Sequence, residues 1–582
     1  MRPKTIATAK PATQNQKPTT QVSPTMPTTN AIHVASVQSG LSLKAYRGDG
    51  AVMLAFDLDQ HLADNLAGFA VSRTAPDGTT EWLLNRLNFD KPLTNQSTPA
   101  DRVWTPSDQA PFQKFRWVDF PTDVQPGNYT YEATAMYFKN GNLVAGPKTA
   151  VSLAIMPADF SNFEMGFTRG YMSSQAYATL FKNAPYRPAD TTKLFYDTAP
   201  FARQYEWLGA HARKMVFEFL QEAIDNKAYS LDLFAYDLDE SDFVAGLQKL
   251  GSRLRAFLDD AALHTKPTAR EPQAKAALIE SAGQGNVKTG HFQRFAHSKV
   301  MILKNETGAA IKALTGSANF SVRGLYVQAN NVLIFNDPKV ADLYEEAFQQ
   351  AFTDMSGFVH SQLAEQWWDV QDTGVPPFSV CFSPHTSPDV SLTKPADAIN
   401  KADSSVLYAI MELVGSGAVM DSVKTLGTKN GIFSYGVTQT TSGLNLYKPG
   451  AANGLLVPFS FLSKQVPPPF NQEVSGGMGQ VIHDKFVVVD FNDTAPVVFT
   501  GSSNLAAGGE TQNGDNLLAI YDQGIVTAYA VEAIRLIDHY HFRAAMSTAT
   551  EATPLALSQS DWWKPYYDEN DIRCRERGLF IR

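Results

Sequence analysis

The chain has 582 residues, more than one hydrophobic core usually holds, so we expect about two to four structural units. Hydrophobic residues make up 44% and charged residues 18%, which excludes a wholly disordered, collagen-like or coiled-coil chain. The chain has 49 Lys and Arg against 58 Asp and Glu, which gives a net charge of −9. It therefore lacks the excess of basic residues that is typical of proteins that bind nucleic acid non-specifically. No stretch reaches the roughly 18 uninterrupted apolar residues of a membrane-spanning helix.

Residues 1–31 are rich in Thr, Pro, Gln and Lys, and this composition predicts a disordered tail. The basic residues at its start are not followed by the apolar core of a conventional signal peptide. We therefore take a cytoplasmic location as the default, with export by a route without a cleaved signal left open. The two cysteines, Cys381 and Cys574, indicate neither a disulfide framework nor a cysteine-based metal site.

Residues 32–157 predict an antiparallel β-sandwich, because seven short apolar or alternating runs are separated by turn signals such as Pro126-Gly127-Asn128 and Asn140-Gly141. The runs are 41–46, 51–58, 68–74, 81–87, 115–120, 129–138 and 150–156. The segment PGNYTYEATAMYF resembles the end of a fibronectin type III or immunoglobulin-like domain. Two roles stay open for such a domain: a module that binds substrate or a surface, and a spacer packed on its neighbour.

From residue 158 the chain alternates strand-like and helix-like segments, which favours α/β architecture. The stretches that begin at Ala223 and Ala398 repeat one order: helix end, apolar strand, acidic or glycine-containing turn, helix, second apolar strand. This repeat predicts two α/β halves in a pseudo-twofold arrangement, at 158–360 and 361–582. The second half includes an aromatic-rich C-terminal segment around Trp562 and Tyr567, which we expect to pack on a core.

Each half carries the same chemical pattern. His297 and Lys299 precede an apolar run, and the return run ends in Gly316-Ser317-Ala318-Asn319. His483 and Lys485 are followed in the same way by Gly501-Ser502-Ser503-Asn504. Residues two apart share a face in extended chain, and a hairpin returns the Ser/Asn loop beside them. Each half therefore brings an imidazole, an ammonium and a carboxamide together.

This trio suits a phosphodiester. The ammonium and amide groups donate hydrogen bonds to non-bridging phosphate oxygens, and histidine can attack phosphorus or protonate a leaving oxygen. Two copies supply one histidine for each task, and two lysines take the place of a metal clamp, so we expect no cofactor. Asn330 and Asp515 each stand eleven residues after the loop asparagine, where an acceptor can orient an imidazole.

The pair of motifs resembles the phospholipase D superfamily, whose signature is H-x-K-x(4)-D followed by G-S-x-N, over roughly residues 160–545. The resemblance implies a metal-independent phosphodiesterase with one site between the two halves, in which one histidine becomes phosphohistidine and the other is the general acid. It also implies two sets of site residues. The first is His297, Lys299, Ser317 and Asn319, and the second is His483, Lys485, Asp490, Ser502 and Asn504.

The first half departs from the signature: Lys304 stands at the Asp position, and Asn330 stands where the second half has Asp515. We expect Asp490 and Asn330 to be structural. From the sequence His483, backed by Asp515, is the better-supported histidine, whereas the family habit favours His297 as the nucleophile. Arg169 either contacts phosphate beside the site or anchors a loop.

We expect a monomer that hydrolyses or transfers a phospholipid head group, in peripheral contact with a membrane. The acidic net charge and the duplication within one chain favour lipid over nucleic acid. Three alternatives remain: a nuclease of the same superfamily, a cardiolipin-synthase-type transferase, and a degenerate phosphate-binding scaffold.

Overall fold

The computed structural model describes residues 31–98, 101, 103–157, 160–371, 374–411, 416–429, 431–440, 442–448, 454–465 and 481–582. The predicted N-terminal tail lies outside these residues, apart from residue 31. None of the helices in the described ranges is long and apolar enough to cross a bilayer.

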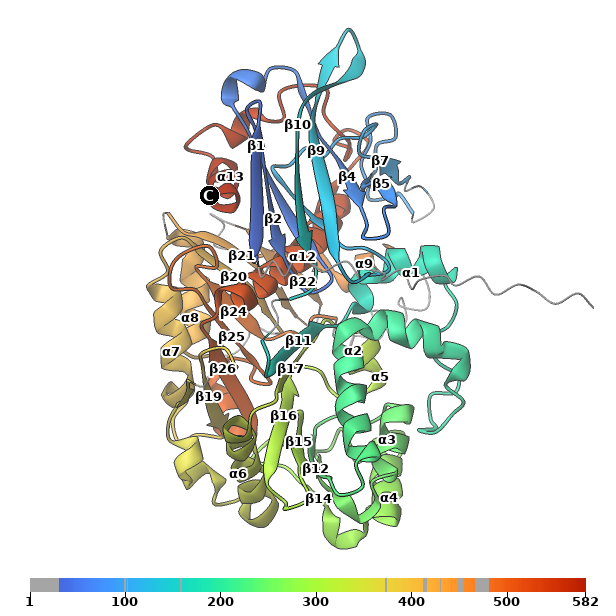
Figure 1. Cartoon of the computed structure of the whole chain (residues 1–582), viewed down its shortest axis with the longest axis vertical. Helices are drawn as coiled ribbons and strands as arrows, with labels where there is room; N and C mark the ends of the chain where they lie inside the picture. The colour runs from blue at the N-terminus through green and yellow to red at the C-terminus, as the bar shows by residue number, and fades with distance from the viewer. Residues whose placement is uncertain are drawn as a thin grey trace, which may run out of the picture.

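The N-terminal part consists of antiparallel sheets, which occupy the upper part of Figure 1. One four-stranded sheet has the order β1 (His33–Gln38), β2 (Leu41–Arg47), β3 (Val52–Leu58), β8 (Arg116–Asp119). The other has the order β10 (Asn142–Ala154), β9 (Asn128–Lys139), β4 (Leu66–Thr74), β5 (Thr80–Trp82). A small third sheet joins β6 (Leu84–Asn85) and β7 (Thr105–Pro106). Buried residues of both large sheets form one core that includes Leu43, Leu54, Phe69 and Tyr131.

All seven predicted runs contain strands, and β1 is a further strand that the sequence analysis did not predict. The β9–β10 hairpin shows how the turn residues act. Asn140 and Gly141 have φ values of 52° and 77°, the left-handed pair that a two-residue hairpin turn needs.

The first α/β unit is built on a seven-stranded sheet in the middle and lower part of Figure 1. Its strand order is β11 (Phe163–Phe167), β17 (Asn331–Phe335), β16 (Ala310–Gly316), β15 (Val300–Lys304), β12 (Ser230–Ala235), β13 (Leu254–Asp259), β14 (Val287–Gly290). The helices are α1 (Ser174–Phe181), α2 (Ala202–Asp225), α3 (Ser241–Gln248), α4 (Glu271–Ala282), α5 (Val322–Tyr326) and α6 (Pro338–Asp354).

The second α/β unit is built on a nine-stranded sheet. Its order is β18 (Trp368–Val370), β19 (Phe378–Ser383), β26 (Asp515–Ile520), β25 (Val497–Gly501), β24 (Phe486–Val489), β20 (Ser405–Ile410), β21 (Phe433–Gln439), β22 (Gly443–Tyr447), β23 (Leu455–Pro458). The helices are α7 (Asp389–Asn400), α8 (Ala418–Thr425), α9 (Phe459–Gln465), α11 (Ala507–Gln512) and α12 (Gln523–Thr548).

Six successive strands match between the two sheets in order and direction. In each, a parallel pair (β12–β13 or β20–β21) is followed by four antiparallel neighbours, which end at β11 in one unit and at β19 in the other. In Figure 1, α7 and α8 lie at the left and α2 to α4 at the right, with both sheets between them. The strands that carry the motif loops, β16 and β25, come into contact.

The C-terminal segment packs on the N-terminal β domain, although the sequence analysis assigned it to the second half. The indole N–H of Trp562 donates to the Leu66 carbonyl at 2.7 Å, and the Tyr567 hydroxyl donates to the Leu58 carbonyl at 2.6 Å. Trp563 and Tyr566 belong to the core shared by the two β-sheets. The last helix, α13 (Ile572–Ile581), contacts β2 and β3. The expected packing of this aromatic segment on a core is thus present, but the core is that of the first domain.

We predict that Trp562→Ala destabilises the β domain, because it removes the indole from the Phe69 and Phe115 rings and leaves the Leu66 carbonyl without its donor. The expected loss in free energy of unfolding is about 3 kcal/mol, measured by urea unfolding followed by near-UV circular dichroism. Trp82→Ala is the matched control, since Trp82 is 38% exposed. Equal losses in the two variants would contradict the assigned role of Trp562.

Candidate active site

The two His/Lys pairs lie in extended segments directly before β15 and β24. His297 and Lys299 precede β15, and His483 and Lys485 precede β24. All four side chains are buried, with at most 5% exposure. Each lysine ammonium donates to the carbonyl of its own histidine, which fixes the pair as a local unit.

The glycine of each G-S-x-N loop is required by the backbone. Gly316 ends β16 with φ 142°, and Gly501 ends β25 with φ 138°. A Cβ at either position would lie 2.4 Å from a carbonyl oxygen, that of Asn331 or Asn516, on the adjacent strand. Only glycine permits this close approach, which turns the following polar residues away from the strand.

The serines of these loops hold the fold rather than present free hydroxyls. Ser317 Oγ donates to Asn330 Oδ1 at 2.8 Å and accepts the Asn331 N–H at 3.0 Å. Ser502 Oγ accepts the Asn516 N–H at 3.0 Å. Both hydroxyls tie the loop to the next strand, and a contact of Ser317 and Ser502 with substrate stays a prediction.

Each histidine is held by the opposite α/β unit. His297 Nδ1 lies 2.7 Å from Asp515 Oδ1, and His483 Nδ1 lies 2.8 Å from Asn330 Oδ1. The prediction that Asp515 supports His483 is wrong, because the partners are exchanged between the units. The carboxylate orients the histidine of the first unit, and the carboxamide orients that of the second.

Backbone hydrogen bonds repeat the exchange. The His297 N–H donates to the Gly514 carbonyl at 2.9 Å, and the His483 N–H donates to the Ala329 carbonyl at 3.2 Å. Return bonds run from the N–H groups of Gly514 and Ala329 to the carbonyl two positions before each histidine, at 2.9 and 3.0 Å. Equivalent residues of the two units thus make equivalent contacts, and these contacts bring both motifs to one place.

The hydrogen bonds also determine the tautomers. Asn330 Nδ2 donates to the Gly324 carbonyl at 2.9 Å, so its Oδ1 must accept from His483. Asp515 can only accept when ionised. Both imidazoles therefore carry a proton on Nδ1, and Nε2 is the nitrogen left for chemistry.

Burial and like charges weaken the cationic forms at this site. Burial, followed by the Lys299 and Lys485 ammoniums, holds the pKa of His297 well below its usual value, and the pKa of His483 falls for the same reasons. Burial lowers the pKa of Lys299 to about 8, and burial together with Lys299 lowers the pKa of Lys485 well below its usual value. Burial raises the pKa of Asp515 to about 6.

Neither of the two ammoniums has a carboxylate within ion-pair distance among the described residues. The buried cluster therefore favours neutral imidazoles and attracts an anion, whose charge would stabilise both ammoniums.

The loop asparagines differ in their partners. Asn319 Nδ2 donates to Asp237 Oδ2 at 2.7 Å, whereas its Oδ1 is buried with no partner in the described part of the chain. Asn504 Oδ1 is also buried without a partner there. These free atoms are amide oxygens, which accept hydrogen bonds, so the groups that can donate to a phosphate oxygen are the amide N–H groups.

Sequence reasoning missed two residues beside His297. Asp237 holds Asn319 and acts electrostatically on Lys299, and the Tyr236 ring lies 4.7 Å from that of His297 and 4.8 Å from the Lys299 ammonium. Both belong to the acidic turn of the repeat, which was noticed as a repeat feature but not as part of the site.

The two positions of the signature Asp, residues 304 and 490, both connect strands, but through different contacts. Asp490 accepts hydrogen bonds from the N–H groups of residues 403–405 at 2.8 to 3.0 Å, which joins the β24–β25 turn to the start of β20. Lys304 instead forms an ion pair with Asp232 on β12 at 2.7 Å, and Arg255 shares that carboxylate. The corresponding strands, β15 and β12 in one unit and β24 and β20 in the other, are thus connected by an ion pair in the first and by backbone hydrogen bonds in the second.

A family model for the cardiolipin synthase, PLD-like domain matches residues 220–352. These residues contain His297, Lys299, Ser317 and Asn319 in the geometry described above. Residues 220–352 are thus similar to a domain of the phospholipase D superfamily. No curated protein sequence matches the chain.

Several solved structures of low identity resemble the chain over part of its length. A phosphatidylserine synthase of Haemophilus influenzae Rd KW20 is 13% identical with a TM-score of 0.39, and the match covers 56% of this chain and 85% of that one. The phospholipase D family member Nuc from Salmonella typhimurium is 22% identical with a TM-score of 0.19, covering 23% and 84%. Yeast tyrosyl-DNA phosphodiesterase is 12% identical with a TM-score of 0.27, covering 53% and 88%.

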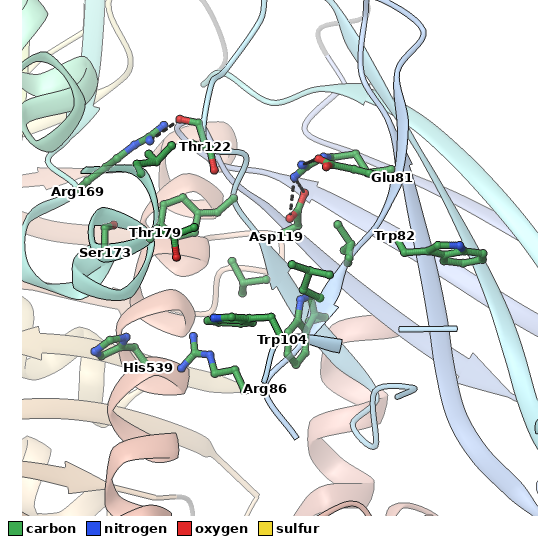
Figure 2. Close-up of a pocket in the computed structure, with 18 of the residues that line it drawn as sticks. Glu81, Trp82, Arg86, Trp104, Asp119, Thr122, Arg169, Ser173, Thr179 and His539 are labelled. Atoms are coloured by element: carbon green, nitrogen blue, oxygen red, sulfur yellow. Dashed lines mark hydrogen bonds and ion pairs between the residues drawn. The ribbon is translucent and has the colours of Figure 1, made fainter. Parts of the chain in front are cut away.

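Arg169 does not contact the cluster of His297, Lys299, His483 and Lys485. Its guanidinium donates to the carbonyls of Thr122 and Pro121 at 2.6 and 3.2 Å and lies over the Trp207 ring. Figure 2 shows it at the edge of a cavity of about 380 Å³ between the β domain and the first α/β unit. Of the two roles left open for Arg169, the structure shows the loop anchor, at residues 121–122.

We predict that Asp490→Ala destabilises the second unit, because three backbone N–H groups lose a charged acceptor. The expected loss is about 2–4 kcal/mol in the free energy of unfolding, measured by chemical denaturation. The exposed Asp421→Ala on α8 should change stability by less than about 0.5 kcal/mol. An unchanged stability of Asp490→Ala would rule out the structural role of this carboxylate.

Proposed function

We propose that the chain is a phosphodiesterase of phospholipase D type, which hydrolyses or transfers a phospholipid head group through a phosphohistidine on His297. The supporting observation is the exchange of partners: His297 is oriented by a carboxylate, and His483 by a neutral amide. The carboxylate of Asp515 can stabilise the positive charge that an imidazole gains when it bonds to phosphorus. The amide of Asn330 leaves His483 a stronger acid in its protonated form.

In the proposed first step, Nε2 of His297 attacks phosphorus and the bond from phosphorus to the head-group oxygen breaks. The negative charge of the bound phosphodiester favours the protonated form of His483, which gives its Nε2 proton to that oxygen, so the head group leaves as an alcohol. Lys299 and Lys485 neutralise the non-bridging oxygens, and Asn319 and Asn504 donate to them.

In the second step, water or an alcohol attacks the phosphohistidine. His483, now neutral, takes the proton of the attacking oxygen, and the bond from phosphorus to His297 breaks. The enzyme returns to its initial protonation state, with a phosphatidate or a new phosphodiester as product.

We also infer that the two α/β units are a duplication about a pseudo-twofold axis through the site, and that the N-terminal domain is a fibronectin III-like or immunoglobulin-like sandwich. Six matching strands and the equivalent backbone contacts of Gly514 and Ala329 support the duplication. Two four-stranded antiparallel sheets around one core support the sandwich.

A phospholipid is the proposed substrate for two reasons. The net charge of −9 disfavours a polyanion, and the matching family model describes a domain of cardiolipin synthase type. The activity experiment below therefore has to distinguish a phospholipid substrate from a nucleic acid.

The first prediction concerns activity. The purified chain should release head group from phosphatidylcholine vesicles with EDTA present, and should leave plasmid DNA intact. His297→Ala and His483→Ala should each lower kcat by about 10³-fold or more. Cleavage of DNA but not of lipid would show that the substrate is a nucleic acid. Unchanged activity in both variants would contradict the proposed mechanism.

The second prediction separates the two histidines. With a phosphodiester that has a p-nitrophenolate leaving group, no acid is needed in the first step, so His483→Ala should accumulate a covalent adduct visible by intact mass spectrometry. His297→Ala should form none. An adduct on His297→Ala alone would reverse the assignment.

The third prediction concerns pH. Because the pKa of Lys299 is lowered to about 8, its ammonium is lost as pH rises through that value, and kcat/KM should fall there. Lys299→Arg, whose guanidinium stays protonated, should move the alkaline limb upward, whereas Lys299→Gln should be slow at every pH. If the alkaline limb of the pH profile stays in place in Lys299→Arg, a group other than Lys299 causes it.

A further inference from the structure

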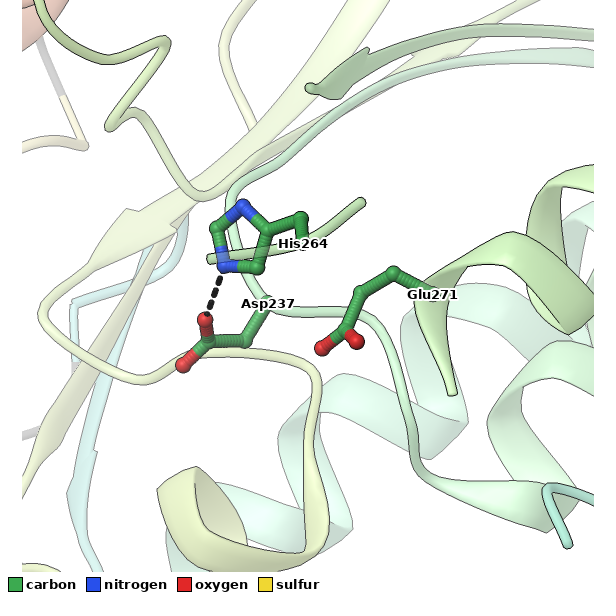
Figure 3. Close-up of side chains that lie close together, drawn as sticks. All are labelled: Asp237, His264 and Glu271. Atoms are coloured by element: carbon green, nitrogen blue, oxygen red, sulfur yellow. Dashed lines mark hydrogen bonds and ion pairs between the residues drawn. The ribbon is translucent and has the colours of Figure 1, made fainter. Parts of the chain in front are cut away.

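A second cluster of titratable side chains lies beside the proposed catalytic residues, around His264. This histidine follows β13, is 3% exposed, and has both ring nitrogens within reach of carboxylates. Its Nδ1 lies 2.7 Å from Asp259 Oδ1 and its Nε2 lies 2.8 Å from Asp237 Oδ1. Figure 3 shows the Glu271 carboxylate directed toward the same point.

Asp259 determines which nitrogen faces that point. Its Oδ1 also accepts the Ala261 N–H at 2.9 Å, and its Oδ2 accepts the Ala296 N–H at 2.6 Å. An acceptor held in this way keeps the proton of His264 on Nδ1 and leaves Nε2 toward Asp237 and Glu271. A carboxylate that orients the far nitrogen is the usual support of a metal-binding histidine.

The three facing side chains lie close to the spacing that an ion needs. One ligand atom from each of Asp237, His264 and Glu271 lies within 4.8 Å of the others. Bonds of about 2.0–2.2 Å require separations of no more than about 4.4 Å, so a small side-chain rotation closes the set. Glu271 forms no ion pair with Lys or Arg in the described ranges.

The cluster is also accessible. A cavity of about 230 Å³ opens against two of its members, His264 and Glu271, and is also lined by Asp260, Lys275 and Thr289. This space admits an ion and leaves room for a water molecule at a fourth coordination position, as a three-residue ligand set requires.

We propose that Asp237, His264 and Glu271 bind one divalent first-row transition-metal ion, with zinc as the best match. One imidazole nitrogen and two carboxylate oxygens suit zinc, whereas magnesium and calcium prefer oxygen ligands alone. The ion replaces the proton that His264 shares with Asp237, and that proton passes to solvent. Asp237 also holds Asn319, so the ion lies one residue away from the proposed catalytic cluster.

The test measures binding and does not depend on the phosphodiesterase proposal. The full chain, first treated with chelator and then desalted, is titrated with zinc chloride by calorimetry. We expect one equivalent to bind, and the Co²⁺ form to show the visible absorption of a four-coordinate site. Glu271→Gln and Asp259→Asn should weaken zinc binding by about 10- to 100-fold.

Glu280→Gln is the matched control, since Glu280 is exposed on the same helix, α4. It should bind zinc as the unaltered chain does, and far-UV circular dichroism should show that all variants fold. Absence of zinc binding, or equal affinities in Glu271→Gln and Glu280→Gln, would overturn the proposal. A folded Asp259→Asn with unchanged affinity would overturn the assigned role of Asp259.

Discussion

The exchange of histidine partners between the two α/β units is the contact on which the site depends. His297 is oriented by Asp515, and His483 by Asn330, so neither imidazole has its orienting group within its own unit. The paired backbone bonds to Gly514 and Ala329 act in the same direction. Each unit by itself would hold an imidazole with no partner for Nδ1, and docking of the units is therefore what completes the site.

Burying the two ammoniums near this contact costs free energy when no anion is bound. Lys299 and Lys485 are fully buried with no carboxylate at ion-pair distance in the described part of the chain, and burial lowers the pKa of both. Unpaired buried charge is tolerated only where the rest of the fold imposes it, and such positions cluster at binding sites. An anionic group placed between the two ammoniums would relieve this cost, which is why the arrangement fits a phosphodiester.

The two units have the same frame but different side chains at key positions. Asp490 joins strands by accepting backbone N–H groups, and Lys304 joins the corresponding strands through an ion pair with Asp232. The same asymmetry appears at Asp515 and Asn330, so one histidine is oriented by a carboxylate and the other by a neutral amide. The proposed mechanism uses this difference to give the two histidines different tasks.

The sequence by itself determined seven strand-containing runs of the β domain, the two motifs and the acceptor positions Asn330 and Asp515. These are local properties: period-two runs, turn residues such as Asn140-Gly141, and a glycine that alone fits the close approach at Gly316.

Only the tertiary structure decided which acceptor serves which histidine, because the spacing is the same in both units and does not say across which interface a side chain reaches. It also decided that Arg169 anchors a loop, that the C-terminal aromatic residues pack on the first domain, and that Asp237 joins Asn319 to His264. Each of these contacts joins segments far apart in the chain, and sequence spacing carries no information about such contacts.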